Sequence, residues 1–168
     1  MGSSPPIDGR PPRAPRARHF DSPQQEAYLN LWRTYDRLRM LEDDLFSQHD
    51  LTAQQYNTLR LLRGAHPGKI PTLHLAGRLV SRAPDITRLL DKLVERGLVD
   101  RERPATNRRV VEVAITPSGI DLLNKLDAQV RECNQKQLGH LSPAELSELV
   151  TLLRKCRTPH EPPESEWG

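Results

Sequence analysis

The side chains with the clearest chemical capacity lie in two short groups that suit an anionic polymer better than a bond-making reaction. The first group holds hydroxyls, a carboxylate and two guanidinium groups: Ser81, Arg82, Asp85, Thr87 and Arg88. The second group holds four arginines around a proline-containing turn: Arg101, Arg103, Arg108 and Arg109. Guanidinium groups form paired hydrogen bonds with guanine edges or phosphate oxygens, and hydroxyls donate to phosphates. The two groups therefore predict a DNA-binding surface.

The sequence around these residues predicts two helices and a β-hairpin that would position them. A first helix is expected over residues 72–80, with Ser81 as the N-cap of a second helix that runs to about Arg96. The apolar face of the second helix recurs at helical spacing: Ile86, Leu89, Leu90, Leu93 and Val94. Gly97 ends this helix, and two strands then flank the turn at residues 104–107. This order predicts a winged helix-turn-helix, with the second helix in the major groove and the hairpin as the wing.

Less specific interpretations remain open for the same residues. The charged face of the second helix could simply be solvated, and Asp85 could stabilise the helix N-terminus through the helix dipole instead of meeting a base. The arginine-rich hairpin could protect an exposed edge strand from aggregation.

The flanking segments predict four more helices, each opened by a capping residue. They are expected at residues 22–48, 52–64, 116–138 and 142–157, and Ile70 is expected in a short third strand beside the wing. The outer helices carry apolar stripes with no partner inside the winged module. Packing against a second chain would bury these stripes and set two recognition helices about 34 Å apart, one turn of DNA.

The chain resembles the MarR family of bacterial transcription regulators over most of residues 22–156. The resemblance is carried by an ordered series of motifs: Leu75-Ala76, Leu79-Val80-Ser81, Ile86-Thr87-Arg88-Leu89, Asp91-Lys92-Leu93, Arg96-Gly97-Leu98-Val99, Arg108-Arg109 and Ile115-Thr116-Pro117-Ser118-Gly119. Asn107 departs from the pattern, because the family usually has an aspartate before the arginine pair. This departure puts the internal salt bridge of the wing in doubt.

The resemblance implies a mainly α fold of about six helices with a small β-hairpin wing. It implies a DNA-binding domain at residues 51–115 and a helical dimerisation region at 22–50 and 116–157. Within the wing it implies that Arg108 enters the minor groove, while Arg109 or Arg101 holds the wing or a phosphate. It also implies a small aromatic or anionic effector, for which a cleft could be lined by Trp32, Tyr35, Arg39, Tyr56 and Arg60. The alternative for the aromatic members is an ordinary place in the core.

The charge distribution agrees with a basic surface in the middle of the chain. The 168 residues have a formal net charge of +3, which many proteins that bind no nucleic acid share. Residues 78–109 hold nine basic and five acidic side chains, so this segment carries +4 and the remainder about −1. The positive charge therefore coincides with the expected DNA-reading elements.

Both ends of the chain have the composition of tails. Residues 1–21 hold five prolines and four arginines, which predicts a disordered basic arm. Alternatively, this arm follows DNA phosphates or a minor groove. Residues 158–168 are proline-rich and acidic and are expected to form a flexible tail.

Membrane, metal and catalytic functions find little support in the sequence. No apolar run could cross a bilayer and no signal peptide is visible, so a cytoplasmic protein is expected. The histidines and cysteines lack metal-site spacing, and no glycine-rich phosphate loop or nucleophile elbow occurs. We therefore expect no enzyme activity, no metal and no cofactor. Cys133 and Cys156 are expected to be buried, inert thiols, with redox sensing as the alternative.

These patterns together predict a sequence-specific regulator of transcription. It would bind near-palindromic operators in double-stranded DNA as a homodimer, and act as a repressor released by a small-molecule effector. The alternative is an architectural or protein-binding winged-helix module without regulated operator binding, which competition with random DNA would distinguish.

Overall fold

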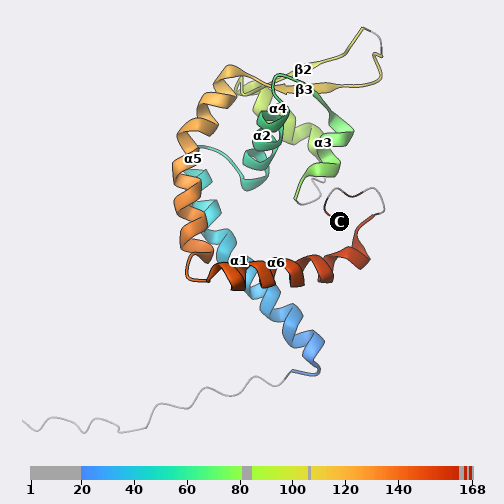
Figure 1. Cartoon of the computed structure of the whole chain (residues 1–168). Coiled ribbons are helices and arrows are strands. Elements are labelled where there is room, and N and C mark those ends of the chain that lie inside the picture. Colours follow the sequence, from blue (N-terminus) through green and yellow to red (C-terminus); the bar gives the residue numbers. More distant parts are fainter. Residues whose placement is uncertain (1–19, 81–84, 106, 163–164, 166, 168) are drawn as a thin grey trace, which may run out of the picture. The chain divides into compact units, whose positions relative to one another are not determined.

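The structure, a computed structural model, describes residues 20–80, 85–105, 107–162, 165 and 167. These residues form six α-helices, three short β-strands and one 3₁₀-helix (Figure 1). The predicted fold class, mainly α with a small wing sheet, is confirmed. The chain divides into two compact units, residues 1–36 and residues 37–168. The expected basic arm falls almost wholly at residues 1–19, outside the described residues.

Helix α1 (Pro23–Ser47) begins where the sequence predicts. The Ser22 hydroxyl accepts a hydrogen bond from the Gln25 backbone N–H at 3.1 Å, which makes Ser22 the N-cap. In the first unit, the large apolar side chains of α1 are exposed. In the second unit, the C-terminal part of α1 buries Phe46, whose ring stacks on Tyr56 with centroids 4.5 Å apart.

The winged module begins with α2 (Ala53–Ala65), β1 (Ile70–Pro71) and α3 (Thr72–Arg78). Thr52 and Gln55 form the predicted capping box at the start of α2. Ile70 pairs with Val113, which confirms the short third strand. Helix α3 ends two residues before the predicted boundary, because Leu79 has an extended backbone and turns its side chain into the core.

Helix α4 (Ile86–Glu95) starts later than predicted, and the assignment of Ser81 as its N-cap is wrong. The cap is Asp85, whose carboxylate accepts from the Arg88 backbone N–H at 2.9 Å. Asp85 directly precedes the apolar repeat, and Pro84 disfavours a helix that begins further upstream. Gly97, with φ of +65°, ends the helix as expected.

The prediction that Val94 lies on the apolar face of α4 is also wrong. Leu89, Leu90 and Leu93 are buried, whereas Val94 is 40% exposed. Successive residues of a helix are about 100° apart, so Val94 falls at the edge of a stripe centred near Leu93.

Strands β2 (Val99–Glu102) and β3 (Glu112–Ile115) form the hairpin, and the sheet order is β1-β3-β2 with antiparallel pairing. The register sets Val99 opposite Ile115, and both side chains are buried. Beyond β2 and β3 the connecting loop projects away from the helices of the module, as a wing does (Figure 1).

Helix α5 (Pro117–Leu138) is joined to the winged module through Thr116. The Thr116 hydroxyl caps α5 by accepting from the Gly119 N–H at 3.1 Å, and it donates to the Gly97 carbonyl at 2.7 Å. A Cβ atom on Gly119 would lie 2.4 Å from the Leu98 carbonyl oxygen, so no larger residue fits this turn. The Thr-Pro-Ser-Gly motif therefore locks α5 onto the end of α4.

Helix α6 (Pro143–Arg157) follows, with Ser142 and Glu145 in the predicted capping box. A 3₁₀-helix, η1 (Thr158–His160), begins the segment expected to be a flexible tail. The Arg157 guanidinium donates to the Trp167 carbonyl at 2.7 Å and lies over the Trp167 ring, 5.7 Å from its centroid.

The core of the second unit lies between α2, α3, α4, the sheet and α5. Its fully buried side chains are contributed by all of these elements: Leu59, Leu62, Leu75, Leu90, Leu93, Val99, Val113, Leu123 and Leu126. At the rim of this core, the Arg63 guanidinium of α2 donates two hydrogen bonds to the Asp127 carboxylate of α5, at 2.9 and 3.0 Å.

We expect Asp127→Asn to flatten the acid sensitivity of folding. The Arg63 hydrogen bonds lower the pKa of Asp127 below its ordinary value. A carboxyl with a lowered folded-state pKa stabilises the protein above its unfolded pKa, and this contribution is lost as the pH falls through the folded value. Wild-type protein should therefore lose stability below about pH 4 more steeply than the variant. The effect should be modest, since both side chains are about one third exposed.

Urea unfolding at pH 7 and at successively lower pH measures this difference. Asp121→Asn, a change at an exposed carboxylate of the same helix, serves as the control. Parallel pH profiles for wild type and Asp127→Asn would contradict the prediction.

Candidate nucleic-acid interface

The outer face of α4 presents polar side chains to solvent, while its inner face is fixed in the core. Thr87 and Arg88 are exposed, and the guanidinium of Arg88 makes no ion pair with any described residue. Asp85 stands directly before the first residue of α4 and uses its carboxylate to cap the helix. The structure thus gives Asp85 the helix-stabilising role that was left open, and leaves Arg88 available for an external anion. Ser81 and Arg82 lie outside the described residues.

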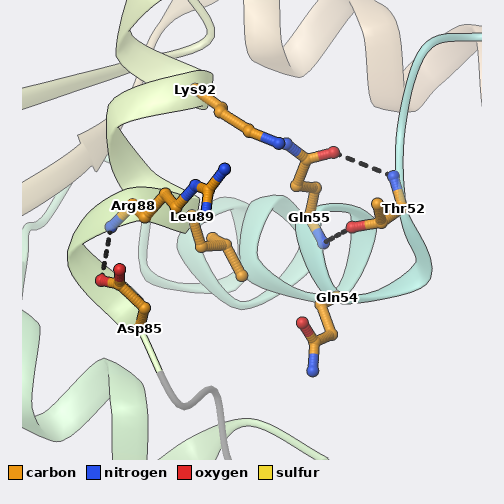
Figure 2. A pocket seen from close by; sticks show the side chains of 7 residues that line it. All are labelled: Thr52, Gln54, Gln55, Asp85, Arg88, Leu89 and Lys92. Atoms are coloured by element: carbon orange, nitrogen blue, oxygen red, sulfur yellow. Dashed lines mark hydrogen bonds between the residues drawn. The ribbon is translucent and has the colours of Figure 1, made fainter.

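A shallow hollow lies between the N-terminal turn of α2 and α4 (Figure 2). Its volume is about 260 Å³. Its lining combines side chains from both helices: Thr52, Gln54, Gln55, Asp85, Arg88, Leu89 and Lys92. Arg88 and Lys92 are spaced four residues apart and therefore lie on one side of α4. The DNA-binding residues predicted from the sequence did not include Lys92 or the α2 residues of this hollow. The four-residue spacing of Arg88 and Lys92 and the cap of α2 are both visible in the sequence.

The wing turn is organised by Asn107. Its side-chain oxygen accepts from the Arg109 N–H at 3.2 Å, its N–H donates to the Pro104 carbonyl at 3.1 Å, and its own carbonyl accepts from the Val110 N–H at 3.1 Å. An aspartate could accept the first of these bonds equally well, so Asn107 retains a turn-forming role that does not need a charge.

The arginines beyond β2 differ from Arg101 in what they contact. Arg103, Arg108 and Arg109 are exposed and pair with no carboxylate in the described part of the chain. Arg101 instead points back to α4, where it donates to the Asp91 carboxylate at 2.6 Å and to the Thr87 carbonyl at 2.7 Å. Arg101 therefore fixes the base of the wing to α4, and three arginines remain at the outer part of the wing.

The candidate effector residues fall in both compact units of the chain. Trp32 and Tyr35 belong to the first unit and are exposed. Arg39, Tyr56 and Arg60 belong to the second unit. Arg39 pairs with Asp43 on its own helix at 3.2 Å. Tyr56 is half-buried against Phe46, and burial raises the pKa of its hydroxyl. Tyr56 thus takes the core position that was the alternative, with Arg60 exposed nearby in the chain.

The two thiols differ in burial, so the prediction that both are buried is confirmed for Cys133 and wrong for Cys156. Cys133 is 7% exposed, and burial raises the pKa of its thiol, which disfavours the reactive thiolate. Cys156 is exposed on α6. Over the described ranges, no three His, Cys, Asp or Glu side chains come together as metal ligands would. None of the helices in this part of the chain combines the length and the apolar character of a membrane span.

The arrangement of α2, α3 and α4 with a three-stranded sheet and a projecting hairpin defines a winged helix-turn-helix protein. A family model described as "MarR family" matches residues 51–111. A MarR transcription factor from Planctomyces limnophilus is 58% identical, and the match covers 80% of this chain and 98% of that chain, with a TM-score of 0.65. The chain belongs to the MarR family of transcription regulators.

Two further solved structures resemble the chain at 26% identity, both with a TM-score of 0.70. One is a mutant MarR from E. coli complexed with operator DNA, and the match covers 78% of this chain and 93% of that one. The other is Bordetella bronchiseptica BpsR, a protein whose DNA binding is regulated by 6-hydroxynicotinic acid. That match covers 78% of this chain and 98% of that one.

Proposed function

We propose that this protein is a sequence-specific, DNA-binding repressor that reads near-palindromic operators as a homodimer and is released by a small-molecule effector. The observation that carries the proposal is the set of exposed cations on one winged module: Arg88 on α4, and Arg108 and Arg109 on the wing, none of them paired with a described carboxylate. The E. coli MarR relative bound to operator DNA supports the same use of this fold.

In this proposal, α4 lies in the major groove and each wing contacts the neighbouring minor groove or backbone. Arg88 recognises a base edge, and Thr87 donates to a phosphate. Ser81 and Arg82 stay predicted DNA contacts from the sequence and lie outside the described residues. Arg101 acts indirectly, because its bonds to Asp91 and Thr87 set the angle between wing and helix.

Dimerisation would bury apolar side chains that the single chain leaves exposed. In α1 these include Tyr28, Trp32 and Tyr35, and in α6 they include Val150 and Leu152. Exposed apolar surface of this extent marks an interface. A two-fold pair would set two copies of α4 about one helical turn of DNA apart, which requires a near-palindromic site.

Selection of bound duplexes from a random DNA pool tests the proposal directly. We expect the full chain to enrich an inverted repeat whose half-sites are about ten base pairs apart. Binding that random DNA competes away as effectively as the enriched duplex would favour the architectural alternative.

Arg108→Ala is expected to weaken binding to every duplex and to flatten its salt dependence. Each cation that neutralises a phosphate contributes about 0.9 to the slope of log affinity against log salt. A dimer carries two copies of Arg108, so the slope should fall by about two. Fluorescence anisotropy at several salt concentrations measures the slope. An unchanged slope would remove Arg108 from the contacts with phosphate or groove.

The effector is proposed to be a hydroxylated aromatic acid, for which 6-hydroxynicotinic acid is the first probe because it regulates the BpsR relative. The predicted effector residues offer the aromatic rings and cations that bind such an acid: Trp32, Tyr35, Arg39, Tyr56 and Arg60. We expect saturable quenching of Trp32 fluorescence in a Trp167→Phe background, and loss of duplex binding at the same concentrations. If a panel of such acids changes neither signal, this part of the proposal fails.

A further inference from the structure

Arg96 joins the end of α4 to the turn that follows α1. It follows the last turn of α4, and its Nη1 donates to the Asp50 carbonyl at 2.6 Å while its Nη2 donates to the His49 carbonyl at 3.1 Å. One planar guanidinium therefore holds two successive carbonyl oxygens that belong to a segment 46 residues earlier in the chain. Such a fork resists both rotation and sliding of one segment against the other.

The end of α1 is acidic and has no basic residue of its own in the last turn. Its last turns carry Asp43 and Asp44. The carbonyl groups at a helix C-terminus lack partners within the helix and carry partial negative charge. Arg96 brings a positive charge from a different helix to this end, and donates to the His49 and Asp50 carbonyls of the turn that follows Ser47.

The turn that Arg96 holds is a strained one. Asp50 has φ of 53°, a left-handed backbone conformation that is costly for a residue with a side chain. Such conformations persist where surrounding contacts over-determine them. The Asp50 carbonyl is one of the two that Arg96 holds, so the tether acts on the strained residue itself.

The same turn is also linked to α5. The His49 Nε2 atom lies 3.2 Å from the Gln129 side-chain oxygen. An amide oxygen can only accept, so the ring nitrogen is the donor. Through His49, the two-residue turn that receives Arg96 is thus connected to a helix of the expected dimerisation region.

We infer that Arg96 is a positioning residue for DNA reading, which fixes the C-terminal end of α4 to the α1–α2 turn and, through His49 and Gln129, to α5. The inference rests on the proposed function in that α4 is taken as the base-reading helix. Arg96 is not offered as a DNA contact. Arg96 follows Arg88 by eight residues, so it lies about 12 Å along the helix axis from Arg88 and further still from the Asp85 cap.

This connection gives the dimerisation helices a route to the recognition helix. A ligand or subunit rearrangement that moves α5 or the end of α1 would displace the turn, and Arg96 would transmit the displacement to α4. Coupling of this kind changes affinity by about five- to 150-fold between linked sites.

Hydrogen exchange on the full chain without DNA tests the tether. We compare wild type with Arg96→Ala, Arg96→Lys and the control Glu95→Ala, which alters an exposed neighbour that pairs with no described residue. Lysine keeps the charge but lacks the planar fork. Both Arg96 variants should exchange faster than wild type at residues 47–52 and at 93–98 together, and the control should not. Faster exchange in only one of the two segments would overturn the inference.

Gln129→Ala tests the second half of the connection, because this residue contacts the turn and not α4. We expect faster exchange at residues 47–52 and, through Arg96, at the end of α4. An effect confined to α5 would overturn the link to that helix. Circular dichroism shows whether each variant folds. If Arg96→Ala does not fold, the comparison of Arg96→Lys with wild type decides the test.

Binding to a duplex selected by the wild-type chain supplies the functional measurement. Arg96→Ala should lower affinity by about five- to tenfold and Arg96→Lys by less, with no change in the salt slope. Full rescue by lysine together with a lower salt slope in the alanine variant would make Arg96 a direct phosphate contact and overturn the inference. If wild type selects no duplex, the proposed function fails, while the exchange data still decide the tether.

Discussion

Replacing Leu31 with glutamate is expected to convert the protein into a monomer and to weaken binding to its selected duplex by at least about 100-fold. A dimer that occupies two half-sites gains about 10² to 10⁴ in affinity over one module, because the second contact becomes intramolecular. A variant that cannot pair loses this gain without losing any DNA-contacting side chain. The loss of affinity should therefore accompany the loss of the dimer.

The location of Leu31 explains why one carboxylate should suffice. It lies in a stripe of exposed apolar side chains spaced three and four residues apart, as one helix face requires: Tyr28, Leu31, Trp32 and Tyr35. Leu31 is 46% exposed and Trp32 is 61% exposed in the single chain. Burying an unpaired charge in the middle of such an interface is far more costly than leaving it in water.

Asn30→Glu provides the matched control on the same helix. Asn30 points away from the stripe and bonds the Glu26 carbonyl on its own helix at 2.8 Å, so a carboxylate there stays in solvent. Asn30→Glu should have the same dimer mass as wild type in sedimentation equilibrium and the same affinity for the selected duplex. A Leu31→Glu variant that remains dimeric, or a wild-type chain that is already monomeric, would remove α1 from the proposed interface.

Most helix starts could be predicted from capping residues in the local sequence, and one could not. Thr52, Thr116 and Ser142 cap the helices that they were predicted to cap, because each stands immediately before an uninterrupted amphipathic repeat. Ser81 failed in the same role because a second candidate, Asp85, lies closer to the repeat that begins at Ile86. Capping preference alone does not choose between two good caps a few residues apart.

The partners of the arginines were harder to predict than their presence. The resemblance implied that Arg109 or Arg101 holds the wing or a phosphate, and Arg101 does hold the wing, but its partner Asp91 on α4 was not predicted. Arg96 was predicted only as the approximate end of its helix, whereas its partners in the structure are carbonyls near residue 50. Such contacts depend on tertiary placement, which no local periodicity encodes.

The structural places of the candidate effector residues could not be predicted from the sequence. Aromatic and basic residues at helical spacing fit both a core and a ligand cleft, and Tyr56 took a place against Phe46. Trp32 and Tyr35 are exposed in the single chain, and they belong to both the proposed dimer interface and the proposed effector site. The dimer and the effector are therefore best tested separately, with Leu31→Glu for the first and fluorescence for the second.

Arg88→Ala is expected to relax base preference at one symmetric pair of operator positions and to weaken specific binding severely. A bidentate arginine–guanine contact contributes about 1–3 kcal/mol of discrimination, and a dimer makes the contact twice, so about 2–6 kcal/mol is lost on the selected duplex. Arg88 suits this role because it is exposed on α4, free of described ion pairs, and follows a turn held by the Asp85 cap.

The lysine variant separates base reading from simple attraction to phosphate. Arg88→Lys keeps the charge, so binding to random DNA and the salt slope should stay close to wild type, while the preference at the paired positions is still lost. This pattern is the reverse of that expected for Arg108→Ala, which should lower the salt slope and leave base preference intact. Repeating the random-pool selection with each variant measures both quantities. If Arg88→Lys selects the same bases as wild type, Arg88 contacts phosphate, and the sequence is read by other residues of the module.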